Sequence, residues 1–136
     1  METVRDDAGR RYLLLKESAE ACLVRDPDTG EEQYIDNGHL TRTGQSPLVT
    51  AAERLSAETR RDLSRVPGER GLGLIAELDR RGPLAVRTLL VEYDVCESDL
   101  HGLLGELRAA GAIEETSVAG ERGYALTEAT RETLDS

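Results

Sequence analysis

The sequence predicts an α+β protein in which strands come first and helices follow. Three short apolar runs between residues 11 and 36 are separated by turn-forming residues, a pattern typical of strands. After residue 46 the apolar residues recur every three or four positions, which is the spacing of amphipathic helices. The length of 136 residues suits one compact domain, or one small domain that carries a substructure.

Residues 1–45 are predicted to form a three-stranded antiparallel β-meander. The expected strands, each a short apolar run, are residues 12–15, 22–24 and 34–35. Between the last two, Pro27 presets a turn and Gly30 supplies a positive φ angle. A sheet of this size is too small to bury a core alone, so we expect it to pack on the helices that follow.

Residues 46–67 are predicted to form connecting helices. Ser46 and Pro47 give a helix start, and Ser56 is a second cap, so one kinked helix and two separate helices both fit the pattern. An apolar stripe has more surface than a small meander must cover, and we therefore expect it to support a homodimer. The stripe consists of Ala52, Leu55, Leu63 and Val66. Three arginines share another face, which we interpret as solvated and balanced by Glu58 and Asp62 rather than as a nucleic-acid stripe; they are Arg54, Arg61 and Arg65.

Residues 68–136 begin with a helix, a short extended segment and a second helix. The first helix runs from about Gly71 to Arg81, where Gly82 and Pro83 stop it. Residues 84–86 are extended, and the second helix is expected at about 87–94.

A third helix, a hairpin and a last helix complete this part of the chain. Cys96 opens the third helix as a poor N-cap, and Gly111 ends it. Its buried face carries leucines spaced by four and three residues, at positions 100, 104 and 107. Strand-like residues 112–118 and 124–126 enclose a turn at 119–123, and Thr127 caps a helix that reaches about Leu134.

The order of these signals resembles winged helix-turn-helix regulators of the ArsR and MarR type. The resemblance rests on Leu-Gly-Glu-Leu-Arg-Ala-Ala-Gly-Ala-Ile at 104–113 and Gly-Glu-Arg-Gly-Tyr-Ala-Leu-Thr at 120–127. It covers about half of the chain and implies a C-terminal winged helix-turn-helix domain over residues 68–136, with a wing at the hairpin. The N-terminal strands are not part of that pattern. The whole chain also resembles small halophilic-archaeal proteins of this layout, to which no established activity attaches.

The composition is acidic and nearly free of lysine. There are 27 acidic and 17 basic residues, for a net charge of −10, and Lys16 is the only lysine. Carboxylates retain water and cations at high salt, whereas the apolar stem of lysine is penalised by salting-out. We interpret the protein as adapted to a cytoplasm at molar salt, the alternative being an ordinary acidic protein tuned for solubility. The first residues lack a secretory signal, and no apolar run is long enough to span a bilayer, so we expect a soluble cytoplasmic protein without membrane contacts.

The resemblance implies binding to double-stranded DNA as a homodimeric transcriptional regulator. The second helix of a helix-turn-helix enters the major groove with its N-terminal residues, and the matching solvent-facing positions here are Glu97, Ser98, His101, Gly102 and Gly105. The two glycines would permit close backbone approach to DNA, or equally let another protein element pack closely there. Arg87 at the start of the preceding helix and Arg122 at the wing tip are the candidate phosphate contacts.

The charge of this region favours a different function. Residues 71–136 hold six arginines and thirteen acidic residues, a net of −7 that opposes a polyanion in dilute buffer. Screening at molar salt weakens the objection, because the Debye length falls to about 3 Å. The alternative hypothesis is a protein–protein interaction module whose winged helix has lost its DNA contacts.

The sequence does not predict an enzyme, a cofactor or a metal site. The two cysteines, Cys22 and Cys96, and the two histidines, His39 and His101, match no familiar zinc spacing. The glycine-rich run at 68–73 follows a helix end rather than a strand, so it lacks the context of a phosphate-binding loop.

Overall fold

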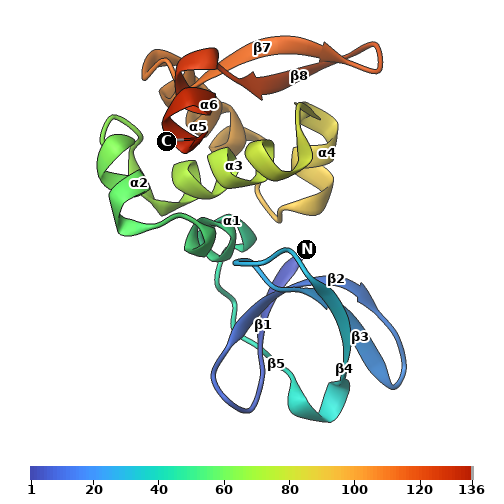
Figure 1. Ribbon diagram of the computed structural model, residues 1–136. Coiled ribbons are helices and arrows are strands. Elements are labelled where there is room, and N and C mark those ends of the chain that lie inside the picture. The colour runs from blue at the N-terminus through green and yellow to red at the C-terminus, as the bar shows by residue number, and fades with distance from the viewer. Residues whose placement is uncertain (136) are drawn as a thin grey trace.

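The computed structural model describes residues 1–135 and shows a mixed α+β protein with two antiparallel sheets. The larger sheet lies at one end of the molecule, and helices separate it from a hairpin at the other end (Figure 1). Its strand order is β4-β3-β2-β1-β5. The strands are β1 (Glu2–Arg5), β2 (Arg11–Glu17), β3 (Ala21–Arg25), β4 (Glu32–Asp36) and β5 (Thr41–Arg42).

The sheet is larger than the three strands that the sequence predicted. Those three are present as β2, β3 and β4, each paired antiparallel with the next. Two further strands extend the sheet, because β1 pairs with β2 and β5 pairs with β1. The prediction missed them because β1 has two buried residues, Thr3 and Val4, and β5 has none, so neither gives an alternating pattern.

The sheet buries residues on both faces. Its curved inner side forms a small cluster of Val4, Tyr12, Leu14, Cys22 and Val24. Successive side chains of a strand point to opposite faces, so Leu13, which is fully buried, faces the other way, toward the helices. On that side a hydrogen bond of 2.5 Å joins Thr3 of β1 to Thr50 of the first helix.

The connecting segment forms two short helices separated by a 3₁₀ turn. They are α1 (Pro47–Ala51) and α2 (Ala57–Asp62), with the turn at Ala52–Arg54. Ser46 accepts a hydrogen bond from the Leu48 amide at 3.3 Å, and Ser56 accepts one from the Thr59 amide at 3.1 Å. Both serines therefore cap helices, and of the two arrangements open from the sequence, the structure adopts separate helices.

The apolar stripe of this segment is fully used inside the chain. Ala52, Leu55, Leu63 and Val66 are all buried in the main core. The prediction that this stripe supplies surplus apolar surface for a dimer was therefore wrong, because helical spacing shows that a face is apolar but not which part of the chain covers it.

The remainder of the chain alternates helices with the strands of a second sheet. Its order is β6-β8-β7. The elements are α3 (Gly68–Arg81), β6 (Leu84–Ala85), α4 (Val86–Glu92), α5 (Glu97–Ala109), β7 (Ile113–Val118), β8 (Glu121–Leu126) and α6 (Glu128–Asp135).

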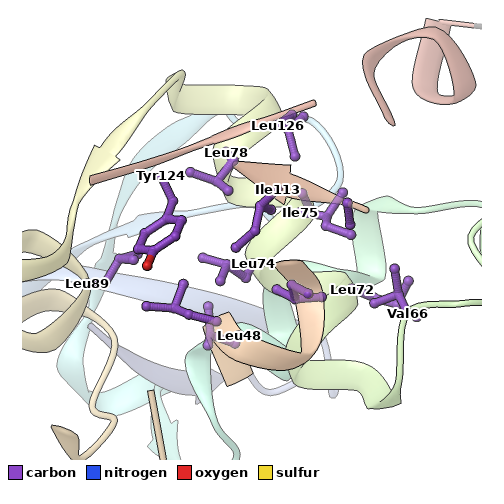
Figure 2. Packing of buried hydrophobic residues seen from close by; sticks show 14 of the residues in the cluster. Leu48, Val66, Leu72, Leu74, Ile75, Leu78, Leu89, Ile113, Tyr124 and Leu126 are labelled. Atoms are coloured by element: carbon purple, nitrogen blue, oxygen red, sulfur yellow. The ribbon is translucent and has the colours of Figure 1, made fainter. Parts of the chain in front are cut away.

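The main core surrounds α3. Leu74 and Ile75 of this helix are fully buried, and Figure 2 shows them among core residues of other elements, including Leu48 and Ile113. Burial of each such side chain contributes about 1.5–3 kcal/mol. Gly73 brings α3 against the Leu48 carbonyl of α1, where a Cβ would lie only 1.7 Å from the oxygen. None of the described helices is long and apolar enough to span a bilayer.

Candidate functional site

The core fixes which side of α5 faces outward. Leu100, Leu104 and Leu107 of this helix are buried in the main core. Cys96 is the N-cap and makes no side-chain capping hydrogen bond. Glu97 and Asp99 place negative charge in the first turn, where it interacts favourably with the helix dipole. The opposite side of α5 is therefore a rigid, exposed surface.

A line of small residues runs along the middle of that surface. Ser98, Gly102, Gly105 and Ala109 are all exposed, and their spacing of four, three and four residues puts them on one line along the helix. We call these four residues the α5 face. It offers a flat backbone surface that another molecule can approach closely.

The two glycines of the α5 face are not required by packing within the chain. A Cβ added at Gly102 or Gly105 would meet nothing within 4 Å in the described structure. Glycine inside a helix costs about 0.5–1 kcal/mol relative to alanine. No packing contact of these two positions within residues 1–135 offsets this cost.

Acidic residues border the α5 face on both sides. On one side Glu97 lies 3.6 Å from the His101 Nε2 atom, measured from its carboxylate. On the other side Asp99 and Glu106 are exposed and form no ion pair with any of residues 1–135. The exposed Arg108, seven residues after His101 and 3.8 Å from Glu115, lies on the Glu97 side as well, so the borders carry three carboxylates and one arginine.

A groove of about 410 Å³ runs along the Asp99 and Glu106 side of α5. Its far wall is the start of α3, from Pro67 to Arg70, and its near wall includes Ser98 and Gly102. Arg70 forms no ion pair among the described residues, and its Nε atom is buried without a hydrogen-bond partner. Glu69 is engaged, because Arg60 donates to both of its carboxylate oxygens at 2.7 and 2.8 Å.

Both predicted phosphate contacts lie at the β7–β8 hairpin, and both are paired with glutamate. Arg122 lies 3.3 Å from Glu115 and donates to the Tyr124 hydroxyl at 2.8 Å; that hydrogen bond, with the nearby Tyr124 and Glu115 groups, raises the pKa of Arg122. Arg87 of α4 lies 3.2 Å from Glu121, although its side chain is 78% exposed.

The structure brings the predicted residues into two groups. Glu97, Ser98, His101 and Gly102 lie together on α5, while Arg87 and Arg122 are both held by glutamates of the hairpin. The sequence reasoning missed Arg70 because this residue comes from a different helix, 28 positions before Ser98 in the chain. It also did not single out Asp99 and Glu106, which helical spacing places beside Gly102.

The row of arginines predicted on the connecting segment separates into different environments. Arg54 pairs with Asp79 at 2.8 Å. Arg61 and Arg65 are exposed and form no ion pair with the described residues, Glu58 and Asp62 included. Glu58 and Asp62, which were expected to balance these arginines, therefore form no direct ion pair with them.

The part of the chain that the structure describes shows no cluster of three or more histidine, cysteine or acidic side chains suited to a metal ion. Cys22 is buried and lies 3.0 Å from the Asn37 side-chain oxygen, and Cys96 is exposed.

A family model matches the chain over residues 1–136. The chain belongs to DUF7346, a family of unknown function. The match includes the N-terminal sheet as well as the helices, so the sheet is part of what defines the family. No curated protein and no solved structure matches the chain.

Proposed function

We propose that this chain is a winged-helix protein that binds another protein through its α5 face. The winged-helix interpretation is supported by the succession α3, β6, α4, α5, β7, β8, α6 and by the sheet order β6-β8-β7. In this succession two helices joined by a tight turn are followed at once by a hairpin, as in the regulators that the sequence resembles.

The observation that carries the choice of a protein partner is that each of three predicted DNA contacts, two arginines and a histidine, has a glutamate beside it. In each of three separate pairs the nitrogen and the carboxylate oxygen are 3.2–3.6 Å apart. The pairs are Arg87–Glu121, His101–Glu97 and Arg122–Glu115. A phosphate approaching any of the three side chains would meet a carboxylate beside it, and phosphate contacts supply much of the affinity of proteins for DNA.

The chemistry of the α5 face supports the same choice. Specific base contacts use arginine, lysine, asparagine or glutamine, and Ser98, Gly102, Gly105 and Ala109 provide none of these side chains. Asp99 and Glu106 would meet phosphates at contact distance. Salt at 1 M does not remove that repulsion, because the Debye length of about 3 Å is no shorter than the contact itself.

Crosslinking from the α5 face tests the proposal. Cys96 is replaced by serine, and a photoactivatable group is attached to Ala109→Cys on the face or to Ala57→Cys on exposed α2 as the matched control. In lysate at molar potassium chloride we expect an adduct from position 109 that protease removes and nuclease does not. The adduct should be absent from position 57 and lost with Gly105→Leu. Equal adducts from both positions, or an adduct sensitive to nuclease alone, would contradict a protein-binding face.

DNA binding is the second candidate, and a specific observation favours it. Arg65 and Arg70 form no ion pair with the described residues, and both line pockets that α5 or its C-cap also borders. A duplex lying on α5 would have these two arginines, rather than Arg87 and Arg122, as its free phosphate contacts.

A further inference from the structure

Five polar side chains link the N-terminal sheet to the end of α4. They are Arg25 of β3, Glu77 and Arg81 of α3, Glu92 of α4 and Tyr93, and we call them the buried polar chain. One terminal nitrogen of Arg25 donates to both carboxylate oxygens of Glu77 at 2.6 Å. The Tyr93 hydroxyl donates to the same carboxylate at 2.5 Å. Arg81 donates to that hydroxyl at 2.8 Å and to Glu92 at 3.0 Å.

The centre of this chain is removed from water. The side chains of Arg25 and Glu77 are 8% and 2% exposed, and Tyr93 is fully buried. Burial, together with the Glu77 charge, raises the pKa of Tyr93, so its hydroxyl stays protonated and donates. Because a buried carboxylate without a partner is strongly destabilising, Glu77 holds Arg25 and Tyr93 in place together.

Tyr93 lies at the end of α4, directly before the turn that leads into α5. It is the C-cap of α4, and Asp94 follows with a φ of 49°, in the left-handed region that turns the chain. Val95 is then buried in the main core, and Cys96 is the N-cap of α5. The first turn of α5 therefore begins only a few residues after the anchored Tyr93 hydroxyl.

Met1, which directly precedes β1, also contacts the end of α4. The amino group of Met1 donates to the Glu92 carbonyl, and the Met1 side chain packs against the main core. The sheet thus holds the end of α4 at two points, one through Arg25 and one through Met1.

We infer that the N-terminal sheet positions α5, and that Arg25 is a positioning residue that acts through Glu77 and Tyr93. The sheet lies at the opposite end of the molecule from the hairpin (Figure 1), and it reaches the candidate site through the α4–α5 turn. The role concerns how α5 is held, so it applies whichever partner binds the α5 face and does not rest on the proposed function.

Native-state hydrogen exchange in molar potassium chloride tests the inference. The measured quantity is the exchange rate of amides 100–104, the first amides of α5 with helical hydrogen bonds, relative to the amides of β7 and β8, which share the main core but lie outside the buried polar chain. Arg25→Met and Tyr93→Phe should each raise this ratio by about tenfold, the effect of one lost hydrogen bond on local opening.

Arg42→Met is the matched control, because Arg42 also forms ion pairs on the sheet, with Glu2 and Glu17, but outside the buried polar chain. It should leave the ratio unchanged. An unchanged ratio in Tyr93→Phe, or an equal rise in Arg42→Met, would overturn the inference. Tyr93→Phe keeps the buried ring and removes only the hydroxyl, so it tests the link from Glu77 to α5. Where Arg25→Met does not fold, Arg25→Lys, which keeps a positive charge beside Glu77 but changes the donor geometry, tests the link from the sheet and should raise the ratio in the same direction.

Discussion

At the residue scale, three helical glycines show how identical residues serve different purposes. Gly73 of α3 is enclosed, since a Cβ there would lie 1.7 Å from the Leu48 carbonyl oxygen. Gly102 and Gly105 of α5 are open, because a Cβ at either position would have nothing within 4 Å. The sequence could place all three inside helices, but it could not tell them apart, because the neighbour of Gly73 comes from α1, some 25 positions earlier in the chain.

Replacement of these glycines by alanine should separate the two purposes. Gly102→Ala and Gly105→Ala should each raise the free energy of unfolding by about 0.5–1 kcal/mol, because alanine restricts the unfolded chain and favours the helix. Gly73→Ala should lower it by about 1–3 kcal/mol through overpacking. Chemical denaturation in molar potassium chloride measures all three, and a loss of stability in both α5 variants would show that these glycines are needed for folding.

At the element scale, the sequence predicted the helices better than the strands. Serine caps at 46 and 56 and the leucine spacing of α5 are local signals, and the structure confirms them. The strands β1 and β5 were missed because such short edge segments contain too few buried positions to show alternation. Three of the four residues of the α5 face, Ser98, Gly102 and Gly105, were singled out from the sequence. The groove beside the face was not, because it depends on Arg70 of another helix.

A better N-cap for α5 should stabilise the protein. Cys96 has the extended backbone of an N-cap but makes no capping hydrogen bond. Cys96→Ser should add one to a free amide of the first turn and raise the free energy of unfolding by about 0.5–1 kcal/mol. Thermal melting of the two proteins under reducing conditions gives the comparison, with Cys22→Ser, which puts a hydroxyl at a buried position, as the contrasting variant that should destabilise. A Cys96→Ser protein no more stable than the parent would show that the α5 start is held by other contacts.

At the scale of the whole molecule, the sequence gives the net charge but not which charged side chains pair with one another. The net charge of −10 is read directly from the residues. The partners of Arg87 and Arg122, two glutamates of one hairpin, follow only from the folded arrangement. Because of these ion pairs, we favour the hypothesis of a protein partner over that of DNA.

The excess of carboxylates should make stability depend on salt. In dilute buffer the unpaired acidic residues repel one another, and at molar potassium chloride this repulsion is screened while apolar burial is strengthened. We expect the melting temperature to rise by at least about 5 °C between these conditions, which for a chain of this size is on the order of 1 kcal/mol. Melting followed by circular dichroism gives the result, and equal melting temperatures would contradict adaptation to high salt.

The most direct test of the central claim, that the α5 face serves a protein rather than DNA, is selection from a random duplex library in molar potassium chloride. If the α5 face serves a protein, repeated rounds should enrich no sequence motif above a bead-only control. An enriched motif that binds the parent protein and weakens with His101→Ala would contradict the account and establish DNA recognition by α5. Loss of affinity for all sites with Arg122→Ala, or with Arg65→Ala and Arg70→Ala, would then show which arginines contact phosphate.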